Sequence, residues 1–159
     1  MWVGSLVRLL EPLGIDGMRI TSTYELGPDE VSHHPAPGRN YMETLAGAGA
    51  WNATPTDLVT ILEAVNPVTG GVKILTPPSM AALRSRIPTG VEPSGYGLGV
   101  MNLGGGAWGH TGTIENTHAM ALVQPDGITW AVTVAGNSPS DSGALRGIVQ
   151  AALRAAFPT

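Results

Sequence analysis

Apolar residues alternate with polar or small residues in two consecutive runs near the C-terminus, and this pattern predicts a β-hairpin. The runs cover residues 118–124 and 128–135 and are rich in β-forming residues. Between them, Pro125-Asp126-Gly127 supplies a preset φ followed by residues that tolerate a turn. One face of the second run is apolar and carries Ile128, Trp130, Val132 and Val134. Threonine and alanine share the other face, so both sides of the predicted sheet can be covered by helices.

Helical periods occur before and after this hairpin. Residues 2–13 place Trp2 and several leucines at helical spacing, and Gly14 follows as a stop. Thr54-Pro55-Thr56-Asp57 predicts a helix start, because Thr54 can cap and Asp57 lies where free N–H groups point. The buried stripe of that helix is predicted to consist of Leu58, Ile61, Leu62 and Val65.

Two more helices are predicted. Thr76-Pro77-Pro78 begins a short one that ends before Pro88. The strongest helical period in the chain follows the capping residues 138–142. Its predicted buried stripe consists of Leu145, Ile148, Val149, Ala152, Leu153 and Ala156.

These elements predict an α/β protein of the α+β type, in which an antiparallel sheet packs against helices. With 159 residues, the chain is long enough for a single domain with one core. We divide it into an N-terminal helix at residues 1–14, a helical and irregular part at 15–95, and the strands plus the C-terminal helix at 96–159. Gly104-Gly105-Gly106 reads as a hairpin loop.

Composition excludes several classes of function. The formal net charge is −4 and there is no basic cluster, so we expect no nucleic-acid partner. The absence of cysteine excludes disulfides, thiol catalysis and cysteine zinc sites. No apolar run approaches the roughly 18–20 residues that cross a bilayer. Arg8 and Glu11 interrupt the N-terminal run, so we predict neither a signal peptide nor a transmembrane helix in this chain.

The histidines are the first candidates for chemistry. His33 and His34 are adjacent, which favours a solvated loop pair over a metal site, and His118 opens a strand, which favours a structural role. A metal-dependent hydrolase using His33, His34 and His110 is kept as a minor alternative. We expect no metal and no cofactor, and the G-x-S-x-G elbow and the G-x-G-x-x-G dinucleotide fingerprint are absent.

His110-Thr111-Gly112 is the most promising short motif. On an exposed strand it would present a hydrogen-bonding ring and a hydroxyl, while the glycine lets a ligand approach the backbone. Three residues alone carry little specificity.

The order of four stretches strengthens this interpretation. These are Leu13-Gly14-Ile15, the run from Ala46 to Leu58, Tyr96-Gly97-Leu98-Gly99 and Gly109-His110-Thr111-Gly112. In this order they resemble the later half of the serine β-lactamase and penicillin-binding-protein-like family, which includes class C β-lactamases, D-alanyl-D-alanine carboxypeptidases and esterases. The resemblance implies a partial β-lactamase or transpeptidase-like fold that lacks its N-terminal strands.

The resemblance also implies roles for residues near His110. His110 would take the place of the lysine in K-T-G, where it hydrogen-bonds the catalytic base. Thr111 would bind the substrate carboxylate and Gly112 would keep the strand open. The backbone N–H of Thr113 would be an oxyanion donor. Glu115 would lie beside the cleft and disfavour an anionic substrate by like-charge repulsion, which favours an esterase-like or altered substrate.

Two motifs of that family are missing here. Lys73, the only lysine, is preceded three positions earlier by Gly70, so S-x-x-K is absent, and no Tyr or Ser is followed two positions later by Asn. We therefore expect the nucleophile to come from a preceding segment and this chain to be inactive alone.

Partners and location are predicted on the same basis. We expect a small-molecule acyl substrate, with either the N-terminal half of the same protein or a second copy pairing with the strand edge near 128–135. The resemblance implies a cell-envelope, periplasmic or secreted location as part of a longer precursor. A non-catalytic binding or self-associating module on the same scaffold is the alternative.

Overall fold

The structure of the chain is a computed structural model that describes residues 8–20, 49–85, 95–114, 117–136 and 141–157. Its elements confirm the predicted α+β class, with antiparallel sheets packed against helices. In chain order they are η1 (Glu11–Leu13), β1 (Arg19–Ile20), β2 (Trp51–Asn52), α2 (Pro55–Val65), α3 (Pro77–Arg84), β3 (Met101–Asn102), β4 (Trp108–Ile114), β5 (Thr117–Val123), β6 (Thr129–Ala135) and α4 (Ser142–Ala156).

The larger sheet has four strands in the order β3-β4-β5-β6, all antiparallel. The predicted hairpin is confirmed as β5 and β6. In its turn, Gln124 N donates to Ile128 O at 2.8 Å and Gly127 adopts a φ of 90°. The side chain of Asp126 accepts a hydrogen bond from Ile128 N at 3.0 Å, so the turn residues act as the sequence predicts.

The predicted helix starts are confirmed by their caps. Thr54 and Asp57 form a reciprocal capping box at α2, with Asp57 N donating to Thr54 Oγ1 at 3.1 Å and Thr54 N donating to Asp57 Oδ2 at 2.9 Å. Thr76 caps α3. Asp141 caps α4 by accepting from Ala144 N at 2.7 Å.

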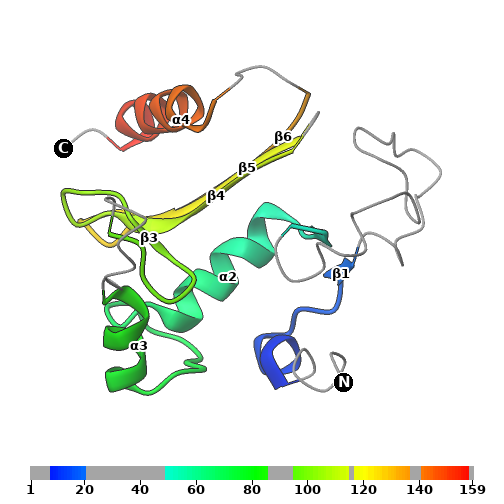
Figure 1. The fold of residues 1–159 in the computed structure, drawn as a ribbon, viewed down its shortest axis with the longest axis vertical. Coiled ribbons are helices and arrows are strands. Elements are labelled where there is room, and N and C mark those ends of the chain that lie inside the picture. The colour runs from blue at the N-terminus through cyan, green and yellow to red at the C-terminus, as the bar shows by residue number, and fades with distance from the viewer. Residues whose placement is uncertain (1–7, 21–48, 86–94, 115–116, 137–140, 158–159) are drawn as a thin grey trace.

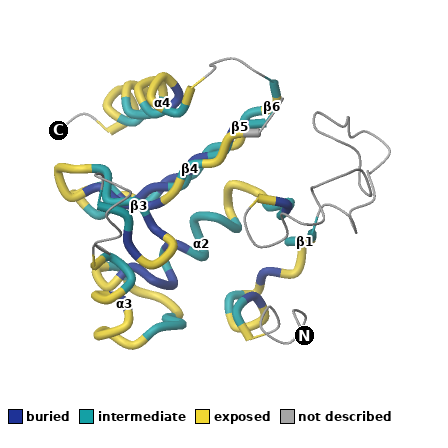
Figure 2. The backbone as a smooth tube through the Cα atoms, in the orientation of Figure 1, coloured by how far each residue is buried: buried dark blue, intermediate teal, exposed yellow. Residues whose placement is uncertain are grey.

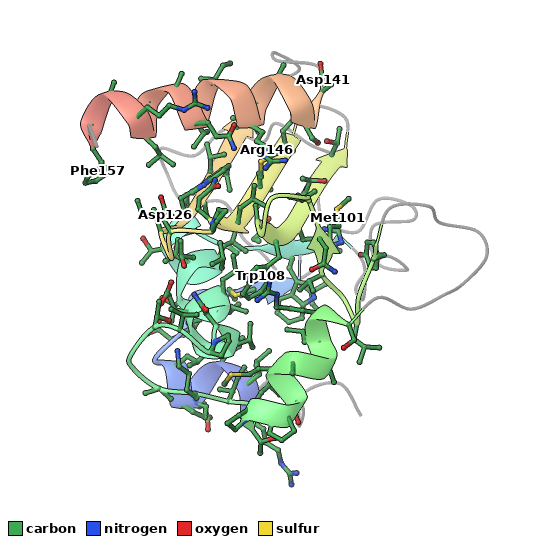
Figure 3. All side chains as sticks on the ribbon, turned by 90° about the vertical axis from the view of Figure 1, so that its left-hand side faces the viewer. Met101, Trp108, Asp126, Asp141, Arg146 and Phe157 are labelled. Carbon is green, nitrogen blue, oxygen red and sulfur yellow. The ribbon has the colours of Figure 1, made fainter. Side chains whose placement is uncertain are left out.

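Helices cover the two faces of the sheet separately. Figure 1 shows α4 along one side of the four strands and α2 along the other. Figure 3 shows the same order after a turn of 90°, with α4 running from Asp141 towards Phe157 and with Trp108 on the opposite side of the sheet. The sequence pattern left open which face of β6 meets α4, and the packing shows that it is the face of Trp130.

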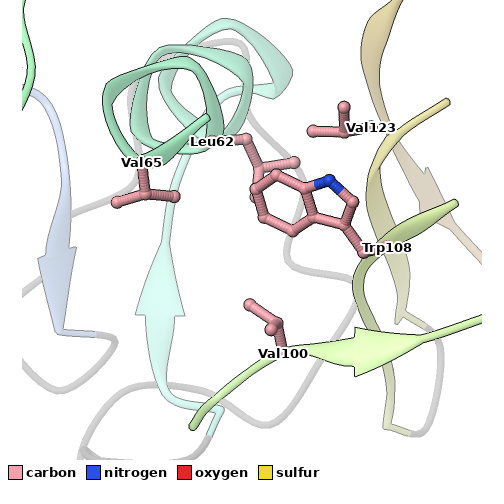
Figure 4. Packing of buried hydrophobic residues seen from close by; sticks show 5 residues of the cluster. All are labelled: Leu62, Val65, Val100, Trp108 and Val123. Carbon is pink, nitrogen blue, oxygen red and sulfur yellow. The ribbon is translucent and has the colours of Figure 1, made fainter. Parts of the chain in front are cut away.

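Each face has its own core. On the α4 side the buried residues are Met120, Leu122, Trp130 and Leu145. On the α2 side they are Leu62, Val65, Val100, Trp108 and Val123, and Figure 4 shows the Trp108 indole lying between α2 and the strands. Figure 2 shows buried segments along the strands and exposed outer surfaces on α3 and α4.

The predicted stripe of α4 is only partly correct. Leu145 is 4% exposed, and Val149 and Leu153 pack against the core, but Ile148 is 59% exposed. Ala152 and Ala156 are also exposed. Fewer residues of α4 contact the sheet than the six-residue period suggests. The sheet lies against only one side of the helix, so the residues at the border of the predicted stripe stay exposed.

The N-terminal part differs from the pattern in one respect. Residues 8–10 are helical, η1 continues them as a 3₁₀ turn, and Gly14 ends the segment with a φ of 67°. Residues 1–7 of the predicted helix and 21–48 of the predicted irregular part lie outside the described residues. Within 15–95, β1 and β2 form a small sheet that pairs Arg19 with Asn52 and Ile20 with Trp51. Strands of two residues are too short to show a period in the sequence.

Candidate functional site

His110 lies on β4 with an exposed side chain, at a point where the edge of the sheet opens. β3 pairs only with the first residues of β4, through Met101 with Gly109 and Asn102 with Trp108. Among the described residues, no strand pairs with positions 110–114 on that side of β4. Within the described part of the chain, positions 110–114 thus form a strand edge of the kind that pairs with extended ligands.

Gly109 shows why a glycine precedes His110. Its φ is 150°, and a Cβ added there would lie 2.1 Å from the Ala121 carbonyl oxygen and 2.8 Å from the Leu122 Cα. Any other residue would push β4 away from β5. Gly112 is different, because the nearest atom to a Cβ there is the Ala119 Cβ at 4.0 Å. The fold has room for a side chain at position 112, so the open space beside His110 is a feature of the surface.

The imidazole of His110 is held by two hydrogen bonds. Its Nδ1 lies 2.6 Å from the carbonyl oxygen of Thr111, and its Nε2 is in a short hydrogen bond with the Tyr96 hydroxyl. The two rings meet edge to face, with centroids 5.6 Å apart and an interplanar angle of 84°. Tyr96 comes from the segment before β3, where it forms an isolated bridge with Met101.

These partners define the tautomer of His110. A carbonyl oxygen only accepts, so Nδ1 carries the hydrogen. In the neutral ring Nε2 is then the acceptor, and the Tyr96 O–H donates to it. The half-buried Tyr96 and the exposed His110 thus form a hydrogen-bonded pair next to the edge of β4.

Thr111 and Thr113 point away from this pair. Strand alternation places their side chains on the face opposite to His110 and Gly112. The Thr111 hydroxyl lies 3.9 Å from Met101 Sδ, and the Thr113 hydroxyl lies 3.2 Å from His118 Nδ1. The predicted substrate role of Thr111 and Gly112 and the predicted oxyanion role of the Thr113 N–H stay predictions.

His118 has the structural position that its strand context predicts. It is 3% exposed, and its Nε2 has no hydrogen-bond partner among the described residues. Glu115, His33 and His34 lie outside the described residues, so their predicted proximity to His110 stays open. Among the residues described, no group of three or more His, Asp or Glu side chains is placed to hold a metal ion. The described helices also include none with the length and apolar character to cross a membrane.

Two surface hollows lie next to other elements. One is lined by α3 and the loop before it together with Asn102, and its polar residues include Arg84 and Ser85. The other lies between the C-terminal part of α4 and the β5–β6 turn, with Ile128, Leu153 and Phe157 in its lining. Neither of these two hollows is lined by His110 or Tyr96.

Comparisons with known proteins show which solved structures share this architecture. No family model matches the chain, and no curated protein sequence matches it. Solved structures do match. A structure of SurE with D-Leu aligns with a TM-score of 0.65 and 24% identity, covering 87% of this chain and 35% of that chain. A second SurE structure aligns with a TM-score of 0.64 and 23% identity, covering 87% of this chain and 37% of that chain. A structure of a D-stereospecific amidohydrolase from Streptomyces sp. aligns with a TM-score of 0.61 and 24% identity, covering 82% of this chain and 42% of that chain.

At this level of identity the matches establish a shared fold. The chain has the fold of part of SurE and of part of a hydrolase, the amidohydrolase, and it spans less than half the length of each. An activity on acyl substrates is not established by a fold alone.

The predicted membership in the serine β-lactamase and penicillin-binding-protein-like family is wrong. No model of that family matches, and the structures that share the fold are SurE and the amidohydrolase. The resemblance depended on short glycine-containing stretches, and the structure gives several of these glycines a backbone reason. Gly109 allows β5 to approach, and a Cβ at Gly97 would lie 2.3 Å from the Leu83 carbonyl oxygen. The envelope location inferred from the same resemblance stays a prediction.

Sequence reasoning missed the role of Tyr96. The stretch Tyr-Gly-Leu-Gly was noted, but the hydroxyl meets His110 across 14 positions, and helical or strand periods do not report such a contact. The available signal was a tyrosine beside glycines just before a strand that pairs with the His110 strand. Pairing of those two strands brings their preceding and following residues together.

Proposed function

We propose that this chain forms part of an acyl hydrolase acting on amide or ester substrates, in which Tyr96 and His110 transfer the proton. The observation that carries the proposal is the hydrogen bond between the Tyr96 hydroxyl and His110 Nε2 at an exposed, unpaired strand edge. The fold shared with part of an amidohydrolase supports the same class of reaction.

The chemistry follows from the tautomer. As the nucleophile attacks the acyl carbon, its proton passes to the Tyr96 oxygen while the Tyr96 proton passes to His110 Nε2. The resulting imidazolium keeps its Nδ1–H on the Thr111 carbonyl. When the acyl bond breaks, Tyr96 donates its proton to the leaving nitrogen or oxygen and recovers one from Nε2. Each proton lost by one group is gained by the next, so the pair returns to its starting state.

The substrate class is proposed from the matched structures. One is described as a D-stereospecific amidohydrolase and another contains D-Leu. We infer that the substrate is an amide or ester whose acyl part is a D-amino acid. It would lie as an extended segment along positions 110–114, where Thr111, Gly112 and the Thr113 N–H are the predicted contacts and Glu115 is the predicted neighbouring charge.

The nucleophile is proposed to come from a longer protein of which these 159 residues are one part. The chains that share the fold are more than twice as long as the region matched. The 159-residue chain by itself is then inactive, and its contribution to the site is the Tyr96–His110 pair.

The test is hydrolysis of D- and L-aminoacyl p-nitroanilides by the longer protein. We expect turnover of the D-substrate, and we expect His110→Ala to lower kcat/KM about a hundredfold or more, the usual scale for an acid–base group. Val68→Ala is the control, because Val68 is 77% exposed in the loop after α2. Unchanged kcat/KM in His110→Ala, or turnover by the 159-residue chain alone, would refute the proposal.

A second candidate is association through β6, favoured by its place at the end of the sheet. Thr133 and Ala135 are exposed on this strand, and among the described residues only β5 pairs with it, so its outer backbone groups can pair with another chain. We propose that the rest of the longer protein covers this edge and that the 159-residue chain by itself pairs with a second copy.

Light scattering on the 159-residue chain tests this association. We expect a dimer or larger oligomer, and we expect Thr133→Lys to shift it towards monomer because a lysine blocks edge pairing. Val68→Lys adds the same charge away from β6 and is expected to leave the dimer intact. A monomer at tens of micromolar, on the order of ordinary working concentrations, would contradict edge pairing.

A further inference from the structure

The turn that follows Tyr96 is hydrogen-bonded within itself and to the end of α3. Gly97 N donates to Val100 O at 2.7 Å, and Leu98 N donates to Leu83 O at 2.9 Å. The second bond satisfies a carbonyl that the end of a helix leaves free. Gly97 makes this approach possible, since any Cβ there would overlap the Leu83 oxygen at 2.3 Å.

The side chain of Asn102 connects β3, the end of α3 and the residue before Tyr96. Asn102 on β3 donates from Nδ2 to the Arg84 carbonyl at 2.9 Å and to the Gly95 carbonyl at 2.8 Å. Its backbone N–H also donates to Gly95 O at 3.3 Å. Both partners of the side chain are carbonyl oxygens, so the amide nitrogen must face them and both of its hydrogens are used.

α3 is also attached to the strand that bears His110. The Arg84 guanidinium lies over the Trp108 ring, 5.2 Å from its centroid, and Trp108 is two positions before His110 on the same face of β4. The end of α3 is therefore linked to Tyr96 through Asn102 and to β4 through Trp108.

From this arrangement we propose that Asn102 is a positioning residue that holds Tyr96 against His110. The proposal rests on the proposed function of the Tyr96–His110 pair. Asn102 is required as an amide, because Asp would place oxygen against two carbonyl oxygens, whereas Leu would remove the donor to the Arg84 carbonyl and leave Gly95 only the longer backbone bond from residue 102. Loss of the amide removes the shorter of the two bonds that hold the Gly95 carbonyl and lets the adjacent Tyr96 move, whereas the bond from His110 Nδ1 to the next residue is local and persists.

The test is ¹⁵N NMR of the histidine rings in the 159-residue chain. Tyr96→Phe sets the reference, because it removes the hydroxyl from His110 Nε2 and leaves the Asn102 bonds in place. We expect Asn102→Leu to shift the Nε2 resonance to the Tyr96→Phe value while Nδ1 stays protonated. Asn66→Leu is the control, since Asn66 is an amide at the end of α2 that is more deeply buried than the half-buried Asn102, and it is expected to leave His110 unchanged. An Nε2 resonance that is unchanged in Asn102→Leu overturns the proposal.

Two further measurements keep the outcome decisive. If Asn102→Leu does not fold, Asn102→Ser retains one donor and is expected to give a smaller shift of the same resonance, and no shift at all overturns the proposal. In the longer protein we expect Asn102→Leu to lower kcat about tenfold, and we expect no further loss when it is combined with Tyr96→Phe. A shifted resonance with unchanged kcat would sustain the positioning role of Asn102 and refute the proposed function of the pair.

Discussion

The two glycines of β4, Gly109 and Gly112, differ in the space around them. Gly109 lies where a Cβ would overlap the backbone of β5, whereas Gly112 has open space around it. From the sequence, Gly112 was the glycine credited with keeping the strand open, and the close contact at Gly109 could not be inferred because it depends on the local approach of β5.

Alanine substitutions at these two glycines test that distinction. We expect Gly109→Ala to lower the free energy of unfolding by about 1–3 kcal/mol, through overlap and an unfavourable φ. Gly112→Ala is the control and should change it by no more than about 0.5 kcal/mol, the usual range for an exposed position. Urea denaturation of both variants measures the difference. Equal losses at the two positions would contradict the packing described for Gly109.

At the scale of elements, the sequence predicted what local patterns determine. Period-two alternation and Pro125-Asp126-Gly127 located the hairpin, and Thr54 with Asp57 located the start of α2. The contacts that build the site were not accessible in this way. Tyr96, Asn102 and the end of α3 meet through a turn whose conformation depends on where α3 ends, and no sequence period records that position.

In α4 as well, the sequence period did not show which residues contact the sheet, and this gives a second prediction. Leu145 is 4% exposed against Trp130, whereas Ile148 is 59% exposed although both belong to the predicted stripe. We expect Leu145→Ala to cost about 2–5 kcal/mol of unfolding free energy, because it leaves a cavity in the core. Ile148→Ala should cost less than about 0.5 kcal/mol. Chemical denaturation compares them, and a large loss from Ile148→Ala would mean that α4 is rotated on the sheet.

The capping box of α2 gives another prediction at the scale of elements. Thr54→Ala removes the acceptor for Asp57 N and should cost about 1 kcal/mol. Thr54→Ser retains the hydroxyl and should retain most of the stability. Similar losses in the two variants would show that the methyl group of Thr54, and not its oxygen, is what stabilises the start of α2.

At the scale of the whole molecule, the described residues form a four-stranded sheet with a helix on each face and with two edges that no other described strand covers. One edge, at β4, carries Tyr96 and His110, and the other is β6. The chains that share this fold are more than twice as long as the matched region, so both edges are places where further protein or substrate would add. Fold class and strand pattern were predictable from the sequence, but family membership was not, because the glycine-rich stretches that suggested it also serve the backbone.

The central claim is that Tyr96 and His110 act as one proton-transfer unit. A double-mutant cycle on kcat/KM for a D-aminoacyl p-nitroanilide, measured in the longer protein, tests it most directly. We predict that His110→Gln and Tyr96→Phe each lower kcat/KM, and that the double variant is no worse than the more damaging single variant. Losses that multiply would show that the two residues act independently, and no loss in either variant would show that the pair takes no part in the reaction.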